Sequence, residues 1–159
     1  MHQYLIALGS NQRHGRYGPP AAILSYALAA LDLHVQSVSP IINSAPVGPS
    51  KRRYANAVAI VETQMSPPEL LDHLKAIEAS FGRRAGGRRW TSRVLDLDII
   101  LWSGGIWGMA DLAIPHPRFR DRDFVLRPAT AIAANWRDPI TGLRVKHCKA
   151  RLDRSARLA

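Results

Sequence analysis

Short apolar segments of strand character and two segments of helical character follow one another in the order strand, helix, strand, strand, helix, strand. The strand candidates are residues 4–8, 34–44, 54–62 and 94–102, and the helix candidates are residues 20–31 and 66–81. This order is that of the ferredoxin-like arrangement, in which an antiparallel sheet carries its helices on one face. We therefore predict an α/β (α+β) fold of this type.

The second helix has the clearest signals. Ser66 and Glu69 stand at capping-box spacing, and the apolar positions that follow, 70, 71, 74, 77 and 81, share one helical face. Beyond the last strand, residues 123–134 predict a further helix and residues 138–142 a turn, which together form a C-terminal helical and hairpin extension. A length of 159 residues fits one domain, 1–159.

Charge and cysteine content restrict the class of protein. The chain has 22 Lys and Arg against 12 Asp and Glu, a formal charge of +10, which attracts polyanions such as nucleoside phosphates or nucleic acid. The single cysteine, Cys148, cannot form an internal disulfide, and no apolar run reaches the roughly 18 residues that span a bilayer. We therefore expect a cytoplasmic protein without membrane contact.

Arginines gather in three places. The first group lies in a glycine-containing stretch, residues 82–93, the second in residues 118–127, and the third in residues 144–157, where we expect a solvated tail. Guanidinium groups suit bidentate phosphate contacts, and the glycines allow residues 82–93 to act as a mobile lid. The alternative for this stretch is a charge run that solvent covers.

Asp96 and Asp98 stand two residues apart on a predicted strand. Both side chains therefore leave the same face about 7 Å apart, while Leu95, Leu97 and Ile99 point to the other face. Two carboxylates beside an arginine-rich loop suit Mg²⁺ carried by a polyphosphate. Alternatively, they only solvate the open face of an antiparallel sheet.

Three further residues each allow a functional and a structural interpretation. Trp90 can stack on a flat ring or pack in the core. His116 lies between two prolines and can either act on a ligand or be structural. Asn56 lies on the same strand face as Tyr54 and can either bind the edge of a heterocycle or form hydrogen bonds across the sheet.

An ordered series of motifs gives these residues a common meaning. The series is Gly9-Ser10-Asn11, Val47-Gly48-Pro49, Tyr54-Ala55-Asn56-Ala57, Glu78 with Gly82-Arg83, Arg89-Trp90, Arg93-Val94-Leu95-Asp96-Leu97-Asp98-Ile99, Ile114-Pro115-His116-Pro117-Arg118 and Arg122-Asp123-Phe124-Val125-Leu126. Over about residues 3–135 it resembles the 6-hydroxymethyl-7,8-dihydropterin pyrophosphokinase family of folate biosynthesis. The resemblance implies a ferredoxin-like fold, ATP as donor, two Mg²⁺ ions, and transfer of the β,γ-diphosphate to the pterin hydroxymethyl group with release of AMP.

The same resemblance implies a role for each matching position. Asp96 and Asp98 would hold both magnesium ions, and Arg83 and Arg93 would meet the triphosphate as catalytic residues. The residues that would line the ATP site with Arg83 and Arg93 are Glu78, Ile99, His116 and Arg122. The residues that would enclose the pterin are Val47, Tyr54, Asn56, Trp90 and Phe124, the two aromatic rings Trp90 and Phe124 on opposite faces of it.

Some positions depart from the family pattern. Residues 12–17 form a basic loop where an acidic residue is usual, and in the lid Ala85, Arg88 and Thr91-Ser92 replace other residue types. The expected partners are the small molecules ATP and the hydroxymethyl dihydropterin, without nucleic acid or membrane. The expected oligomeric state is a monomer. Two alternatives are a basic ferredoxin-like RNA-binding module, which two aspartates on a central strand disfavour, and a family member that binds its ligands without catalysis.

Overall fold

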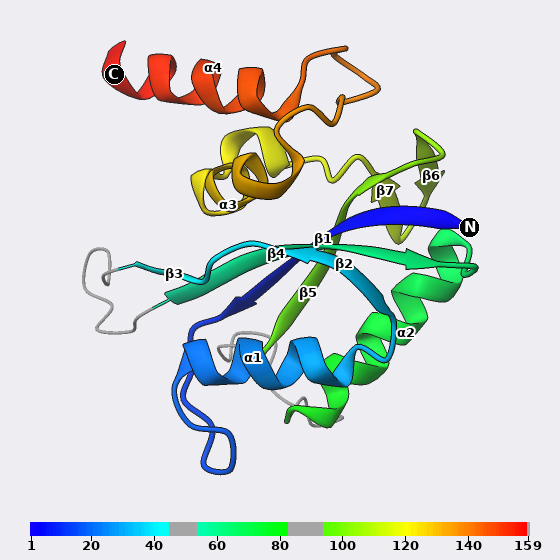
Figure 1. Cartoon of the computed structure of the whole chain (residues 1–159), viewed down its shortest axis with the longest axis vertical. Helices are drawn as coiled ribbons and strands as arrows, with labels where there is room; N and C mark the ends of the chain where they lie inside the picture. Colours follow the sequence, from blue (N-terminus) through cyan, green and yellow to red (C-terminus); the bar gives the residue numbers. More distant parts are fainter. Residues whose placement is uncertain (45–53, 83–93, 159) are drawn as a thin grey trace.

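The computed structural model describes residues 1–44, 54–82 and 94–158. Its main sheet has the strand order β2-β4-β1-β5, with β3 also paired to β4, and every pairing is antiparallel. The strands are β1 (His2–Ser10), β2 (His34–Val38), β3 (Ile42–Ser44), β4 (Tyr54–Thr63) and β5 (Asp96–Trp102). This order and these directions confirm the predicted ferredoxin-like sheet, which Figure 1 shows nearly edge-on.

Two helices cover one face of the sheet. These are α1 (Pro20–Ala30), which packs on β1 and β4, and α2 (Pro67–Ser80), which packs on β5. Pro20 begins α1 at a position where a missing N–H costs nothing, and the predicted capping box begins α2, with Ser66 Oγ accepting from the Glu69 N–H at 3.5 Å. The prediction that both helices share a face is therefore confirmed.

The predicted strand 34–44 is two strands. Pro40 has no N–H to donate, and the neighbouring Ser39 bonds twice to Val58: its N–H donates to the Val58 carbonyl and its Oγ accepts from the Val58 N–H, both at 2.9 Å. The ladder is interrupted there, so β2 ends at Val38 and β3 begins at Ile42. The prediction of one strand was wrong for this reason.

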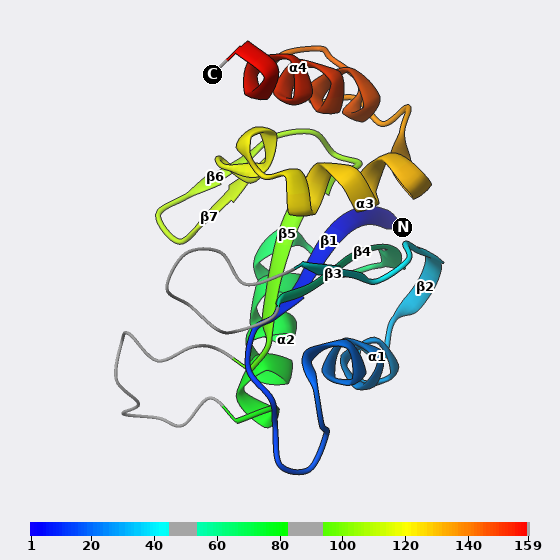
Figure 2. The same cartoon turned by 90° about the vertical axis from the view of Figure 1, so that its left-hand side faces the viewer.

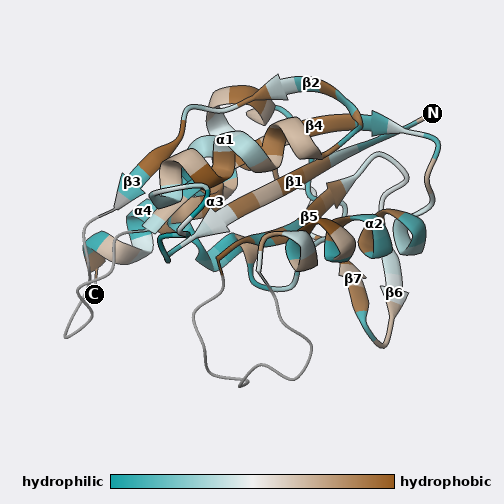
Figure 3. Cartoon of the chain, turned by 90° about the horizontal axis from the view of Figure 1, so that it is seen from below, coloured by the Kyte–Doolittle hydropathy of each residue, from teal (hydrophilic) through white to brown (hydrophobic). Residues whose placement is uncertain are grey.

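Alternation along the strands gives the sheet two apolar faces. On β1, Tyr4, Ile6 and Leu8 belong to the core beneath α1 and α2, and Leu5 belongs to a second core on the other face. Figure 3, which views the molecule from the side of α1 and α2, shows hydrophobic segments running along β1, β4 and β5. The sheet is thus buried on both sides over part of its area.

The second core lies under the C-terminal extension. Its helices are α3 (Asp123–Ala133), which packs on β4, and α4 (Val145–Leu158), which packs on α3; Figure 2 shows them as successive layers above the sheet. A hairpin turn at 138–142 joins them, with the Gly142 N–H donating to the Asp138 carbonyl at 2.8 Å. The helix at 123–133 and the turn are confirmed, but the expected solvated tail was wrong, because Val145 and Cys148 are buried in this core.

Two small elements connect β5 to α3. They are a hairpin of β6 (Trp107–Met109) and β7 (Leu112–Ile114), and a short 3₁₀ helix, η1 (Phe119–Asp121). Across the described ranges, no helix is both long enough and apolar enough to cross a bilayer.

Candidate active site

The α3-bearing face of the sheet is open at the end where β1 finishes. A cavity of about 640 Å³ lies there, between the strands and the segment that leads into α3. Its lining residues are Ala7, Leu8, Gly9, Ser10, Asn11, Tyr54, Asn56, Asp96, Asp98, Arg118, Asp121, Arg122, Phe124 and Val125.

Three neighbouring strands supply the floor of the cavity. In the register of the sheet, Gly9 pairs with Asn56 on one side and with Asp96 on the other, and Ala7 pairs with Asp98. The row across the end of the sheet is therefore Asn56, Gly9, Asp96. A Cβ on Gly9 would lie 3.1 Å from Asn56 Oδ1, so only glycine leaves the amide its present place.

The alternation predicted for β5 is confirmed. Leu95, Leu97 and Ile99 are buried in the core beneath α1 and α2, while Asp96 and Asp98 line the cavity. Ile99 is therefore on the far face from the cavity, and its predicted contact with ATP stays a prediction.

Glu78 also lies behind the sheet. It is buried in α2, only 7% exposed, and its Oε2 accepts a hydrogen bond of 2.8 Å from the Leu97 N–H. That N–H belongs to the residue between Asp96 and Asp98. Glu78 thus contacts the strand that carries both aspartates and does not line the cavity, and its predicted role toward ATP stays a prediction.

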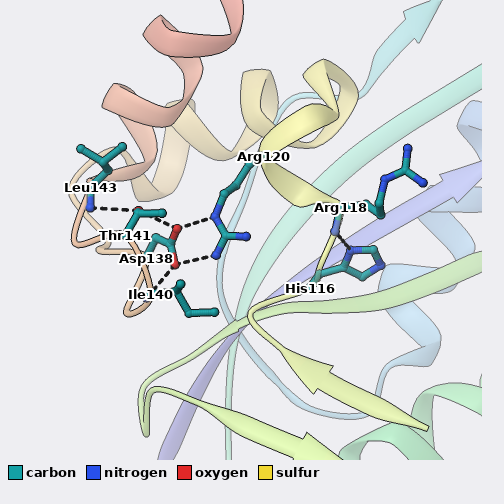
Figure 4. A network of polar contacts seen from close by, with 7 residues as sticks. All are labelled: His116, Arg118, Arg120, Asp138, Ile140, Thr141 and Leu143. Atoms are coloured by element: carbon teal, nitrogen blue, oxygen red, sulfur yellow. Dashed lines mark hydrogen bonds and ion pairs between the residues drawn. The ribbon is translucent and has the colours of Figure 1, made fainter. Parts of the chain in front are cut away.

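The wall opposite the strands comes from residues 118–125, in the segment that begins at His116. The His116 N–H donates to the Ile100 carbonyl at 2.9 Å, which attaches this segment to β5. The His116 Nδ1 accepts from the Arg118 N–H at 3.0 Å (Figure 4), so the neutral ring carries its proton on Nε2. Burial lowers the pKa of His116, Asp98 opposes this, and Arg122 and Arg118 lower the pKa further.

Arg122 and Phe124 complete the rim. Arg122 Nη1 is 4.0 Å from Asp98 Oδ2, and its guanidinium carbon is 5.6 Å from the centre of the Phe124 ring. Phe124 is 46% exposed, which is unusual for a large apolar side chain and leaves one ring face available at the cavity. Tyr54 and Asn56 line the same cavity from β4. The structure therefore brings together Asp96, Asp98, Arg122, Tyr54, Asn56 and Phe124.

Four of the predicted site residues, Val47, Arg83, Trp90 and Arg93, lie outside the described residues, as does most of the predicted lid 82–93. His116 is attached to β5 next to the cavity through its backbone, without being among the lining residues.

Some lining residues were not predicted as site residues. Arg118 and Asp121 face the cavity, and so does the end of β1, where Ser10 Oγ and Asn11 Oδ1 are buried without a hydrogen-bond partner among the described residues. The sequence held a signal for Arg118 and Asn11, since both belong to motifs in the ordered series. Buried polar atoms of this kind are usually paired, and a ligand in the cavity can supply the missing donor.

The side chains at the site that could coordinate a metal indicate whether Mg²⁺ suits it. Within the parts of the chain that the structure describes, no three His, Cys, Asp or Glu side chains are grouped as ligands for a metal. Mg²⁺ typically takes one or two carboxylates and fills its other positions with water and substrate phosphate. The pair Asp96 and Asp98 fits an ion that arrives with a polyphosphate better than a permanently bound metal.

The cavity has two carboxylates next to arginines, and it also has an amide and two aromatic rings. This combination is typical of an enzyme that transfers a phosphoryl group to a flat substrate. Comparisons with known proteins identify the family. Residues 5–134 match the model of the family 7,8-dihydro-6-hydroxymethylpterin-pyrophosphokinase (HPPK).

Individual relatives agree with this match. The 2-amino-4-hydroxy-6-hydroxymethyldihydropteridine pyrophosphokinase of Haemophilus influenzae is 41% identical over 135 residues, which is 82% of this chain and 81% of the relative. The enzyme of the same name from Synechocystis sp. is 38% identical over 145 residues, 89% of this chain and 71% of the relative. The chain therefore belongs to the HPPK family and is a pyrophosphokinase of folate biosynthesis.

A solved structure supports the fold. The HPPK-DHPS of Plasmodium falciparum, crystallised with pteroate, superimposes with a TM-score of 0.75 at 11% sequence identity. The match covers 94% of this chain, and the chain spans 44% of the length of that protein. Of the functions considered from the sequence, family membership supports the pyrophosphokinase.

Proposed function

We propose that this chain transfers the β,γ-diphosphate of ATP to the hydroxymethyl group of 6-hydroxymethyl-7,8-dihydropterin and releases AMP. In this reaction the hydroxyl oxygen loses its proton to solvent and bonds to the β-phosphorus, and the bond from that phosphorus to the oxygen bridging it to the α-phosphate breaks. The observation that carries the proposal is the row Asn56, Gly9, Asp96 across the end of the sheet. One strand, β1, lies between the Asn56 amide, which would read the edge of the heterocycle, and the carboxylate pair on β5.

Asp96 and Asp98 would hold two Mg²⁺ ions between β5 and the phosphates. Bound Mg²⁺ would neutralise the charge of the triphosphate and keep the attacking and leaving oxygens in line. Arg122, 4.0 Å from Asp98, adds a fixed positive charge at the same end of the cavity, and Arg83 and Arg93 would contribute further ones. The neutral ring of His116 offers its Nε2 proton to a phosphate oxygen or to the ribose.

The pterin would lie against β4. Asn56 can donate and accept at the edge of a pyrimidine-like ring, and Tyr54 lies two residues away on the same face. The exposed ring of Phe124 would cover one face of the pterin, with Trp90 on the other. Val47 would close this side of the pocket.

The test is to incubate the chain with ATP, Mg²⁺ and 6-hydroxymethyl-7,8-dihydropterin and to identify both products. We expect AMP and the pterin diphosphate in equal amounts, and no product when EDTA replaces Mg²⁺. Formation of ADP would contradict the proposal by indicating transfer of a single phosphate. Binding of both ligands without any product would favour the alternative of a family member that lacks catalysis.

A further inference from the structure

A buried ion pair links the C-terminal extension to the wall of the cavity. Asp138, in the turn before α4, is fully buried and lies beyond the residues 5–134 that the family model matches. Its carboxylate accepts from Arg120 twice: Nε to Oδ2 at 2.5 Å and Nη2 to Oδ1 at 2.8 Å (Figure 4). Such a two-point contact fixes the direction of the guanidinium as well as its distance.

The turn around Asp138 is built to hold that carboxylate. The Thr141 hydroxyl donates to Oδ2 at 2.7 Å, and the Ile140 N–H donates to Oδ1 at 3.0 Å. Burial raises the pKa of Asp138, but the hydrogen bonds from Arg120, Thr141 and Ile140 outweigh it and lower the pKa to about 2. Asp138 is therefore a satisfied, permanently charged acceptor at neutral pH.

Arg120 stands in the centre of the segment that supplies His116, Arg118 and Arg122. In Figure 4 the Arg120 side chain points toward the Asp138 turn, away from the side where His116 and Arg118 lie. The segment is attached at one end by the His116 N–H to β5. At the other end the Arg122 carbonyl accepts from the N–H groups of Val125 and Leu126 in α3, at 3.0 Å each. Between these two ends the segment is held by Phe119, which is buried in the second core, and by the ion pair of Arg120 with Asp138.

A second link lies on the other side of Arg122. Lys149 of α4 forms an ion pair with Asp153, at 2.5 Å, and its Nζ is 3.1 Å from Asp123 Oδ1, without hydrogen-bond geometry. Asp123 is the first residue of α3 and directly follows Arg122. The extension thus forms ion pairs with residues on both sides of Arg122, and of these two pairs the one with Asp138 has a fully buried carboxylate.

We propose that Asp138 is a positioning residue for the nucleotide: through Arg120 it sets the place of the segment that presents His116, Arg118 and Arg122 to the phosphates. This inference rests on the proposed function, because it assumes that ATP occupies this end of the cavity. It gives the C-terminal extension a part in nucleotide binding, although α4 itself does not line the cavity.

The test compares three variants with the wild type. Asp138→Asn keeps the shape but removes the charge that orients Arg120. Arg120→Met with Asp138→Asn removes both charges of the pair, so that no uncompensated charge is buried, and keeps an oxygen acceptor for the Thr141 hydroxyl and the Ile140 N–H. Val145→Ala is the matched control, because it removes buried methyl groups from the same core and leaves both partners of the Arg120–Asp138 ion pair in place.

Steady-state kinetics, thermal unfolding and the Kd of a non-hydrolysable ATP analogue with Mg²⁺ are measured for each. For both pair variants we expect KM for ATP and Kd for the analogue to rise about tenfold or more, since small displacements of binding groups have effects of this size. KM for the pterin should rise less than KM for ATP, because Tyr54 and Asn56 come from β4 and Phe124 alone of the described pterin residues lies next to the segment. Val145→Ala should lower the unfolding temperature and leave ATP binding unchanged.

Two results would overturn the inference. The first is that either pair variant is folded and has a KM for ATP and a Kd for the analogue within about twofold of the wild-type values. The other is a rise of the same size in Val145→Ala, which would show that any loss of stability in this core has this effect. If Asp138→Asn does not fold, the double variant decides. A wild type that binds the analogue but forms no AMP would contradict only the proposed function.

Discussion

Glu78 of α2 accepts a hydrogen bond from the Leu97 N–H at 2.8 Å, and Leu97 is the residue between Asp96 and Asp98. A carboxylate on one face of the sheet therefore holds the backbone that presents two carboxylates on the other face. Because the contact is buried, it restrains β5 where the aspartates leave it.

The first prediction concerns this contact. Glu78→Ala leaves the Leu97 N–H buried without that acceptor, which costs about 1–3 kcal/mol of stability, and should lower turnover. Glu78→Gln keeps an oxygen acceptor and should retain more activity than Glu78→Ala. Urea unfolding and turnover at saturating substrates check both. Equal turnover in the two variants would show that the hydrogen bond does not matter for catalysis.

The second prediction concerns the carboxylate pair. Asp96→Asn and Asp98→Asn should each lower turnover by at least roughly a thousandfold, about 4 kcal/mol, while the fold persists. Circular dichroism confirms folding, and Asp111→Asn, in the exposed turn of the β6–β7 hairpin, is the control with the same charge change. A folded Asn variant with more than about a tenth of wild-type turnover would return the pair to the role of solvating a sheet face.

The third prediction concerns the close approach of Gly9 to Asn56. Gly9→Ala puts a Cβ 3.1 Å from Asn56 Oδ1, so the amide must move, and we expect KM for the pterin to rise. In an Asn56→Ala background the same change should have little further effect, because the group it displaces is absent. Additive effects in the double variant would mean that Gly9→Ala acts on something other than Asn56.

The fourth prediction concerns aromatic stacking on the pterin. Phe124→Ala and Trp90→Ala should each weaken pterin binding by about 0.5–1.5 kcal/mol beyond the loss of burial. Fluorescence titration with the pterin measures this, with Tyr26→Ala as a control at an exposed aromatic that does not line the cavity. Unchanged affinity in both variants would exclude stacking by these rings.

The fifth prediction concerns acid stability. The pKa of Asp138 is about 2 in the folded chain, below the ordinary value of 3.8, so its contribution is present above pH 3.8 and is lost as the pH falls toward 2. This contribution is about 2 kcal/mol. The difference in unfolding free energy between wild type and Asp138→Asn should therefore be larger at pH 5 than at pH 2.5. A difference that does not depend on pH would mean that the carboxylate is not selectively stabilised in its charged form.

The parts of the fold that were predictable depend on local patterns. The period of two along 95–99 placed Asp96 and Asp98 on one face, and the capping box placed the start of α2, because both signals lie within a few residues. The strands β6 and β7 have three residues each, too few to show a period. In α4 only Val145 and Cys148 are buried, so its sequence reads as a charged, solvated stretch.

The candidate site shows the same limit. Asp96, Asn56 and Phe124 could be proposed because each belongs to a motif. The pair of Arg120 and Asp138 could not, since the two residues are 18 positions apart and neither stands in a periodic pattern. That Glu78 lies behind the sheet was equally unpredictable, because its place depends on how α2 packs on β5.

The row Asn56, Gly9, Asp96 spans three adjacent strands, and strands in a sheet are about 4.8 Å apart. The main chains that present the amide and the carboxylate are therefore separated by two strand spacings, about 10 Å. Hydrogen bonds of the sheet fix this separation, whichever side chains occupy positions 56 and 96. New side chains at positions 56 and 96 could change the distance between ring and phosphate only by the length of a side chain, because the strand order sets the rest.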